Sequence, residues 1–64
     1  MITAKAARVN RGYTQEQCAN AVGVTRSTYI KYVNGETAPS VNMAREIADF
    51  LKTNLNDLVF LPKI

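Results

Sequence analysis

Apolar side chains recur at the spacing of an α-helix along most of the chain, and glycine and proline divide the pattern into short segments. Gly12, Gly23, Gly35 and Pro39 follow one another at short intervals, as expected for short helices joined by tight turns. The pattern predicts four helices, over residues 3–10, 15–22, 26–34 and 41–51, and a short fifth helix over 55–60. Because no segment alternates with the period of a half-buried strand, the sequence predicts an all-α, five-helix fold.

Side chains that cap helices stand at the predicted helix starts. Thr14 and Gln17 fit a capping box, in which the hydroxyl and the amide side chain each bond to the other residue's backbone. Thr25, Ser40 and Asn54 precede the later helices and are good N-cap residues. Only residues 23–25 separate the second helix from the third, and so short a connection forces a steep crossing. The chain therefore predicts a helix-turn-helix over about residues 15–34.

The apolar positions of these helices predict the core. Cys18 is expected to pack as a small hydrophobe, with a redox or metal role as the alternative. Tyr29 and Tyr32 share the inward face of the third helix, which favours packing with exposed hydroxyls over stacking on nucleic-acid bases. The other expected core residues are Ala4, Ala7, Ala19, Val22, Met43, Ala44, Ile47, Ala48 and Leu51.

Length and composition narrow the function classes. With 64 residues, one cysteine and no histidine, we expect one domain over residues 1–64 without an internal disulfide, a zinc site or any cofactor. Five dispersed acidic residues without a histidine do not form a catalytic pair, so no enzyme is predicted. The net charge of +3 suits a phosphate-bearing partner. Neither a membrane span nor a secretory signal is present, so we expect a cytoplasmic protein.

A series of motifs runs through nearly the whole chain. It comprises residues 8–12, Thr14-Gln15-Glu16, Ala19, Gly23-Val24-Thr25-Arg26-Ser27-Thr28, Asn34-Gly35, Pro39-Ser40 and Ile47-Ala48 with Leu51. In this order and spacing the motifs resemble the phage Cro/repressor, or XRE-type, family of helix-turn-helix regulators. The resemblance implies a compact lambda-repressor-like domain of five helices that binds a palindromic double-stranded DNA operator as a homodimer. It also suggests a bacterial or phage-encoded switch protein.

The resemblance also implies which side chains meet DNA. It places Arg26, Ser27, Ile30 and Lys31 at the base edges, and Gln15, Thr25, Thr28 and Asn34 at the sugar-phosphate backbone. Arginine can donate two hydrogen bonds to guanine O6 and N7, which agrees with the first group. The alternative for Arg26 and Lys31 is a solvated charged face, and solubility is the expected role of Lys5, Arg11 and Lys52.

Two residues depart from the family pattern. Val33 stands where the family commonly has a glutamate that pairs with the arginine matched by Arg8. We therefore expect Arg8 to turn to a DNA phosphate or to Glu36 or Glu46. Ile30 stands where a polar side chain is usual, and can contact a thymine methyl group or be a neutral surface residue.

The apolar stretch 59–64 leaves two interpretations open. Phe60 and Leu61 either close the core or form a two-fold dimer contact. Two other functions compete with the regulator: a protein-interaction adaptor or antitoxin-like module on the same fold, with a regulatory protein as its partner, and a nonspecific nucleic-acid binder. Selection from random duplex DNA would separate the three.

Overall fold

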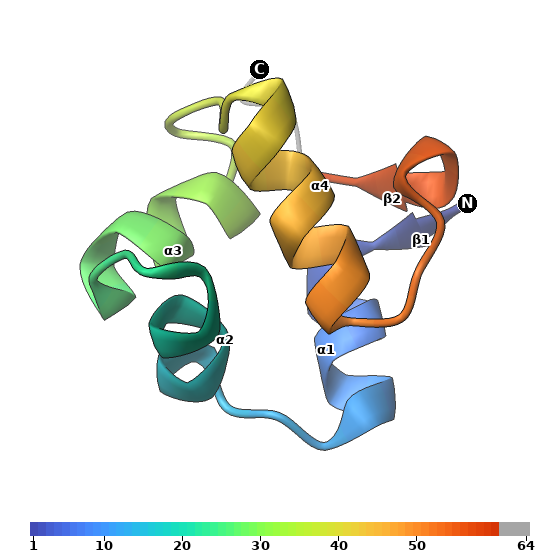
Figure 1. The fold of residues 1–64 in the computed structure, drawn as a ribbon, viewed down its shortest axis with the longest axis horizontal. Helices are drawn as coiled ribbons and strands as arrows, with labels where there is room; N and C mark the ends of the chain where they lie inside the picture. Colours follow the sequence, from blue (N-terminus) through green and yellow to red (C-terminus); the bar gives the residue numbers. More distant parts are fainter. Residues whose placement is uncertain (61–64) are drawn as a thin grey trace.

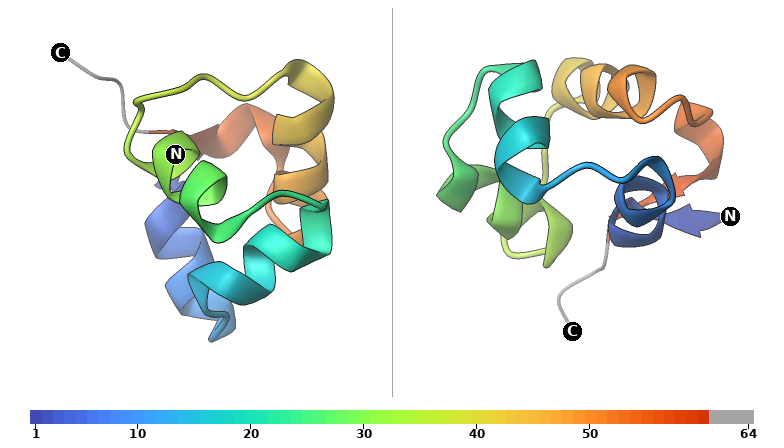
Figure 2. Two further views of the ribbon diagram at one scale, coloured as in Figure 1. Left: turned by 90° about the vertical axis from the view of Figure 1, so that its left-hand side faces the viewer. Right: turned by 90° about the horizontal axis from the view of Figure 1, so that it is seen from below.

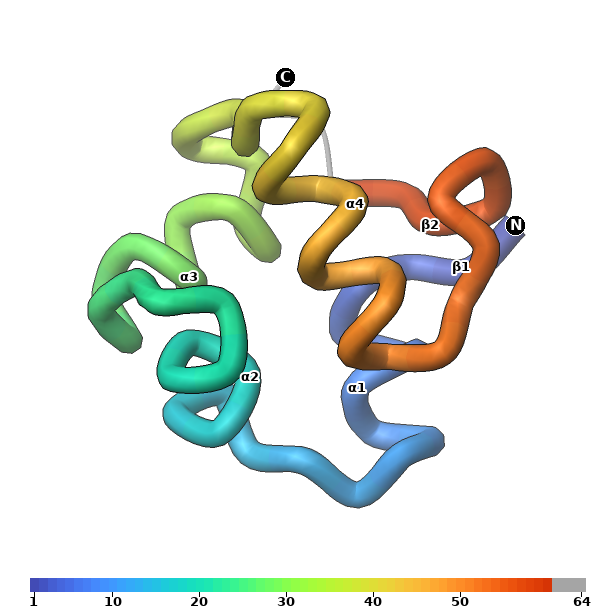
Figure 3. Tube along the Cα trace, viewed as in Figure 1, coloured from blue at the N-terminus to red at the C-terminus, as the bar shows by residue number. Residues whose placement is uncertain are grey.

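The computed structural model describes residues 1–60, which form four helices and one pair of very short strands (Figure 1). The helices are α1 (Ala4–Arg11), α2 (Gln15–Val22), α3 (Arg26–Val33) and α4 (Val41–Phe50), and a 3₁₀ turn, η1 (Leu55–Asp57), follows them. Strand β1 (Ile2–Thr3) pairs in parallel with β2 (Leu58–Val59). Helices α2 and α3 lie on one side, α1 and the strands on the other, and α4 lies between them (Figures 1 and 3).

The helices begin at the caps that the sequence predicts. The Thr14 hydroxyl accepts from the Gln17 backbone N–H at 3.0 Å, and the Thr14 N–H donates to Gln17 Oε1 at 2.8 Å, so the capping box is complete. The hydroxyls of Thr25 and Ser40 each accept from the N–H three residues later, at 3.1 Å. Thr3 caps α1 in the same way. These local bonds confirm the predicted starts of α2, α3 and α4.

Two glycines end α1 and α2 as predicted. Gly12 has φ +75° and Gly23 has φ +78°, in the left-handed region that glycine adopts at little cost. The Gly23 N–H bonds back to the last turn of α2. The chain therefore reverses at residue 23 with the carbonyls of Ala19 and Asn20 bonded to the turn.

The predicted fifth helix over 55–60 is wrong. Asn54 does cap the segment, since its Oδ1 accepts from the Asn56 N–H at 2.9 Å, but only the three residues of η1 are helical. Leu58 and Val59 are extended and pair with Ile2 and Thr3. Asparagine and aspartate are weak helix formers, and pairing with β1 satisfies the backbone instead. The described fold is thus four helices with a strand pair rather than five helices.

The predicted core is largely confirmed. Ala4, Ala7, Cys18, Ala19, Val22, Tyr29, Val33, Ile47, Ala48 and Leu51 are buried, whereas Met43 and Ala44 are half-buried. Tyr29 is 0% exposed, and its hydroxyl is buried with no hydrogen-bond partner among the described residues. An exposed hydroxyl was expected there, and this is wrong because the whole side chain, the hydroxyl included, is buried in the core cluster. Tyr32 is half-buried.

Two contacts join the ends of α1 and α4. The Arg11 Nε–H donates to the Leu51 carbonyl at 3.1 Å, and the Tyr13 ring stacks on Phe50 with the ring centroids 4.5 Å apart. Arg11 is exposed, as a solubility role requires, and its bond to a carbonyl at the end of α4 is a second role that the sequence did not predict. Within residues 1–60, no helix combines the length and apolar character needed to cross a membrane.

Candidate nucleic-acid interface

The α2–turn–α3 unit is held by buried small and aromatic residues. Ala19 on α2 and Tyr29 on α3 are both 0% exposed, and the Val24 N–H donates to the Ala19 carbonyl at 3.0 Å. Because Ala19 is fully buried, a larger side chain at this position would have to displace its packed neighbours. The second view in Figure 2 shows α2 and α3 running in clearly different directions, which agrees with the steep crossing predicted from the three-residue connection.

Helix α3 is divided into a buried and an exposed side. Tyr29 and Val33 are buried in the core. Arg26, Ser27 and Lys31 are exposed, and Ile30 between them is half-buried. Ser27, Ile30 and Lys31 are three and four residues apart and therefore share one helical face, while Arg26 is the first residue of the helix. The structure thus leaves Arg26, Ser27 and Lys31 exposed on α3, with Ile30 half-buried on the face that carries Ser27 and Lys31.

The two threonines at the start of α3 bond to each other. The Thr25 hydroxyl donates to Thr28 Oγ1 at 2.9 Å and accepts from the Thr28 N–H at 3.1 Å. Thr25 therefore uses its proton within the protein, whereas Thr28 keeps one to donate outward. Thr28 is the better placed of the two for a phosphate contact, a distinction that residue type alone does not make.

The other predicted backbone contacts lie at helix ends. Gln15 is the first residue of α2 and is half-buried, and Asn34 follows α3 and is exposed. The charges in this part of the chain cancel, because Glu16 and Glu36 balance Arg26 and Lys31. The candidate surface is therefore marked by which side chains of α3 are exposed, and not by an excess of positive charge.

Arg8, on α1, binds the chain itself. Its Nη1 donates to the Tyr13 carbonyl at 2.6 Å, and its Nε is buried with no partner among the described residues. The expected bond to Glu36 or Glu46 is therefore wrong, because the carbonyl in the α1–α2 connection is within reach. The phosphate alternative stays a prediction.

Cys18 and Tyr29 are neutral members of the core. Burial is the largest effect on both, and it raises the pKa of the Cys18 thiol and of the Tyr29 phenol. Cys18 is 1% exposed. The thiol thus packs as a small apolar group, which is the role expected for it.

Of the two candidates in the apolar tail, Phe60 packs partly buried against the core cluster, and Leu61 lies outside the described residues.

Comparison with known proteins identifies the family. The family model described as "Helix-turn-helix" matches residues 5–58. The cryptic phage CTXphi transcriptional repressor RstR of Vibrio cholerae is 35% identical over 52 residues, which cover 81% of this chain and 47% of RstR. The chain thus spans about half the length of RstR. No solved structure gives a significant match.

Two further relatives are matched over most of their length. An HTH-type transcriptional regulator of Methanothermobacter thermautotrophicus is 40% identical over 84% of this chain and 80% of its own. The HTH-type transcriptional regulator YgzD of Bacillus subtilis is 33% identical over 89% of this chain and 86% of its own. Together with the capped helices, the three-residue turn and the exposed face of α3, these matches show that the chain belongs to the Cro/XRE-like helix-turn-helix family of DNA-binding transcriptional regulators.

Proposed function

We propose that this protein is a sequence-specific operator-binding regulator that places α3 in the major groove of double-stranded DNA. The observation that carries the proposal is the exposure of Arg26, Ser27 and Lys31 on a helix whose opposite side is fixed in the core by Tyr29 and Val33. A helix-turn-helix reads base edges from the first turns of its second helix. Because the core already fixes the backbone of α3, these side chains can contact the bases with little further loss of backbone conformational entropy.

Each exposed residue of α3 has a distinct proposed role. Arg26 makes a bidentate contact with guanine O6 and N7, and Ser27 donates to or accepts from a neighbouring base. Lys31, one turn later, reaches a base or a phosphate. Ile30 is half-buried, which leaves an apolar edge suited to a thymine methyl group.

The backbone contacts are proposed from the helix ends. Gln15 binds a phosphate at the positive N-terminus of α2, and Asn34 binds one beyond the end of α3. Thr28 donates its free proton to a third phosphate, while Thr25 acts chiefly by holding Thr28 in place. These contacts set position and orientation on the duplex and do not select the sequence.

We further propose that the protein is a repressor and binds a palindromic operator as a homodimer. RstR carries the name of a phage transcriptional repressor, which favours a switch role in a phage or another mobile element and a cytoplasmic site of action. A two-fold dimer presents two copies of α3 about one DNA turn, ~34–36 Å, apart.

Selection of bound molecules from random duplex DNA tests the proposal. A motif with two-fold symmetry supports the regulator and the dimer. A single unsymmetrical half-motif supports sequence-specific binding but contradicts the dimer on a palindrome. No motif despite salt-sensitive binding indicates a nonspecific nucleic-acid binder, and no binding by folded protein indicates the protein-interaction alternative.

A further inference from the structure

Asn34, at the end of α3, is followed directly by Gly35 and is exposed. A side chain on the following residue obstructs attack by that residue's backbone nitrogen on an asparagine side chain, and glycine has no Cβ to obstruct it. The other asparagines all precede a residue with a side chain; they are Asn10, Asn20, Asn42, Asn54 and Asn56. The Asn34 amide is therefore the one with the easiest access to a backbone nucleophile.

The closed end of α3 holds this pair in a conformation that does not react. A five-membered ring between the Gly35 nitrogen and Asn34 Cγ requires the nitrogen to turn towards the Asn34 side chain, whereas Asn34 has a helical ψ of −4°. The Gly35 N–H donates to the Tyr32 carbonyl at 3.2 Å, and the Glu36 N–H donates to the Lys31 carbonyl at 2.9 Å. Rotation about the Asn34 Cα–C bond breaks both bonds, so the reaction requires the end of α3 to open.

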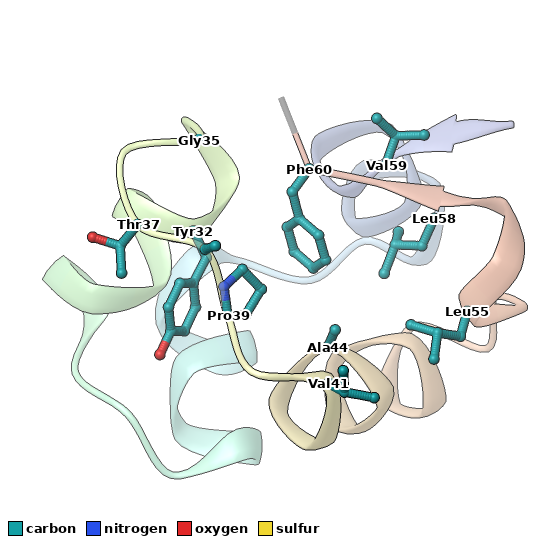
Figure 4. A pocket seen from close by; sticks show the side chains of 11 residues that line it. Tyr32, Gly35, Thr37, Pro39, Val41, Ala44, Leu55, Leu58, Val59 and Phe60 are labelled. Atoms are coloured by element: carbon teal, nitrogen blue, oxygen red, sulfur yellow. The ribbon is translucent and has the colours of Figure 1, made fainter. Parts of the chain in front are cut away.

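Few contacts hold this end of α3 closed. Asn34, Glu36 and Thr37 are exposed. On its inner side the loop over residues 35–39 borders an apolar groove of about 590 Å³, which α4, the η1–β2 segment and Tyr32 complete (Figure 4). Among the described residues the loop thus rests partly against open space instead of packed side chains. A segment with few buried contacts and exposed hydrogen bonds opens locally at a lower free-energy cost than global unfolding.

We propose that Asn34 is a site of spontaneous deamidation, and that local opening at the end of α3 sets its rate. In the open segment the Gly35 nitrogen attacks Asn34 Cγ, a new N–Cγ bond forms, the nitrogen loses its proton and the side-chain amide leaves as ammonia. Water then opens the cyclic imide. Attack at Cγ gives aspartate, and attack at the Asn34 backbone carbonyl gives isoaspartate. Either product carries a carboxylate in place of a neutral amide.

The new carboxylate is unfavourable for DNA binding, a consequence that rests on the proposed function, whereas the deamidation does not. The Asn34 amide is the proposed donor to a phosphate, and a carboxylate cannot donate and repels the phosphate charge. The carboxylate also lies at the negative end of the α3 dipole and two residues before exposed Glu36. Deamidation therefore limits the time for which the free regulator stays active.

Incubation of the folded full chain in heavy-oxygen water, followed by peptide mass spectrometry, tests the site. Each asparagine that reacts gains one heavy oxygen atom when water opens the ring. We expect the label at Asn34 and not at the other asparagines. Asn34→Gln should stay unlabelled at this position, because its ring would need six members. No label at Asn34, or equal labelling of another asparagine, would overturn the assignment.

Two rate comparisons test the local opening. In denaturing guanidinium chloride Asn34 should react at least ~10-fold faster than in the folded chain, because the bonds that fix Gly35 are then absent. Gly12→Ala destabilises the whole domain through its left-handed backbone at φ +75° and leaves the end of α3 unchanged. Folded G12A should therefore react at the wild-type rate. A faster reaction in G12A would show that global unfolding is required, and equal rates with and without denaturant would show that the fold gives no protection. Either result would overturn the mechanism.

Binding to duplex DNA separates the modification from the proposed function. Asn34→Asp reproduces the charge of the product, and Asn42→Asp changes the net charge equally at an exposed position of α4. N34D should weaken binding to all duplexes by about 10–100-fold through loss of a charge-assisted hydrogen bond, while N42D keeps nearly the wild-type affinity. If Asn34 is labelled but N34D and N42D bind equally, the proposed phosphate contact fails and the modification site stands. If N34D weakens binding but Asn34 takes no label in the folded chain, the modification site fails and the proposed function stands.

Discussion

Replacing Gly23 by alanine tests what the turn between α2 and α3 requires. Gly23 has φ +78°, and a Cβ built there meets nothing within 4 Å. The cost of Gly23→Ala therefore comes from the left-handed backbone, about 1–2 kcal/mol, and is partly offset by the lower entropy of the unfolded alanine chain. We expect a net loss of about 1 kcal/mol, which lowers Tm by roughly 4–8 °C in a domain of this size.

Gly12→Ala is the matched control, because Gly12 has φ +75° and equally open surroundings but lies outside the α2–α3 turn. Urea denaturation should give similar losses of unfolding free energy for the two variants. Against the upper limit of about 3–5 kcal/mol for a domain this small, a loss of about 1 kcal/mol should leave both variants mostly folded at 25 °C and able to bind duplex DNA as the wild type does. The explanation by backbone strain would be refuted if G23A lost several kcal/mol more unfolding free energy than G12A. It would also be refuted if folded G23A no longer bound duplex DNA.

Three further predictions concern individual side chains. Burial raises the pKa of the Cys18 thiol, so unfolding free energy should fall as pH rises above about 8.5, where the unfolded chain ionises, by at most ~1.4 kcal/mol per pH unit. Cys18→Ala should remove this pH dependence of the unfolding free energy, measured by urea titrations between about pH 8.5 and 9.5. An unchanged pH dependence would contradict its assignment to the Cys18 thiol. Thr28→Val should weaken binding to all duplexes by a similar factor, about 1 kcal/mol, whereas loss at one base pair only would assign Thr28 to base recognition. Arg11→Ala should lower the unfolding free energy by about 1 kcal/mol through loss of the bond to the Leu51 carbonyl, with Lys5→Ala as the neutral control; equal stabilities would show that this bond contributes nothing.

The features predicted correctly from sequence depend on contacts within four residues. The caps at Thr14, Thr25 and Ser40 and the turn at Gly23 each join a side chain or a backbone conformation to the adjoining helix. Such contacts leave a signature in residue type and spacing. The positions of the four helices could therefore be derived before the structure was known.

The features predicted wrongly or missed depend on partners distant in sequence or on backbone acceptors. A strand of two residues is too short to show alternation, and β2 exists because Leu58 and Val59 meet β1. The acceptors of Arg8 and Arg11 are the carbonyls of residues 13 and 51, and a carbonyl has no sequence signature because every residue has one. Spacing likewise placed Tyr29 on the inward face without showing how deeply its hydroxyl is buried.

The candidate site was predicted by family resemblance more than by chemistry. The charges over residues 15–36 cancel, so composition alone does not point to α3. The structure adds that Arg26, Ser27 and Lys31 are exposed and that Thr25 is bonded to Thr28. The groove beside Tyr32 was not foreseen, because its walls come from three segments that only the fold brings together.

The most direct test of the central claim compares Arg26→Ala with Lys5→Ala, which removes an exposed cation from α1. Fluorescence anisotropy would measure the affinity of each variant for the selected operator and for every single-base-pair change in it. We predict that R26A loses about 1–3 kcal/mol of discrimination at one base pair and keeps it elsewhere, whereas K5A keeps the full pattern. If R26A instead lost the same amount of binding free energy on every duplex and kept the discrimination at every base pair, the claim that α3 reads bases through Arg26 would be contradicted.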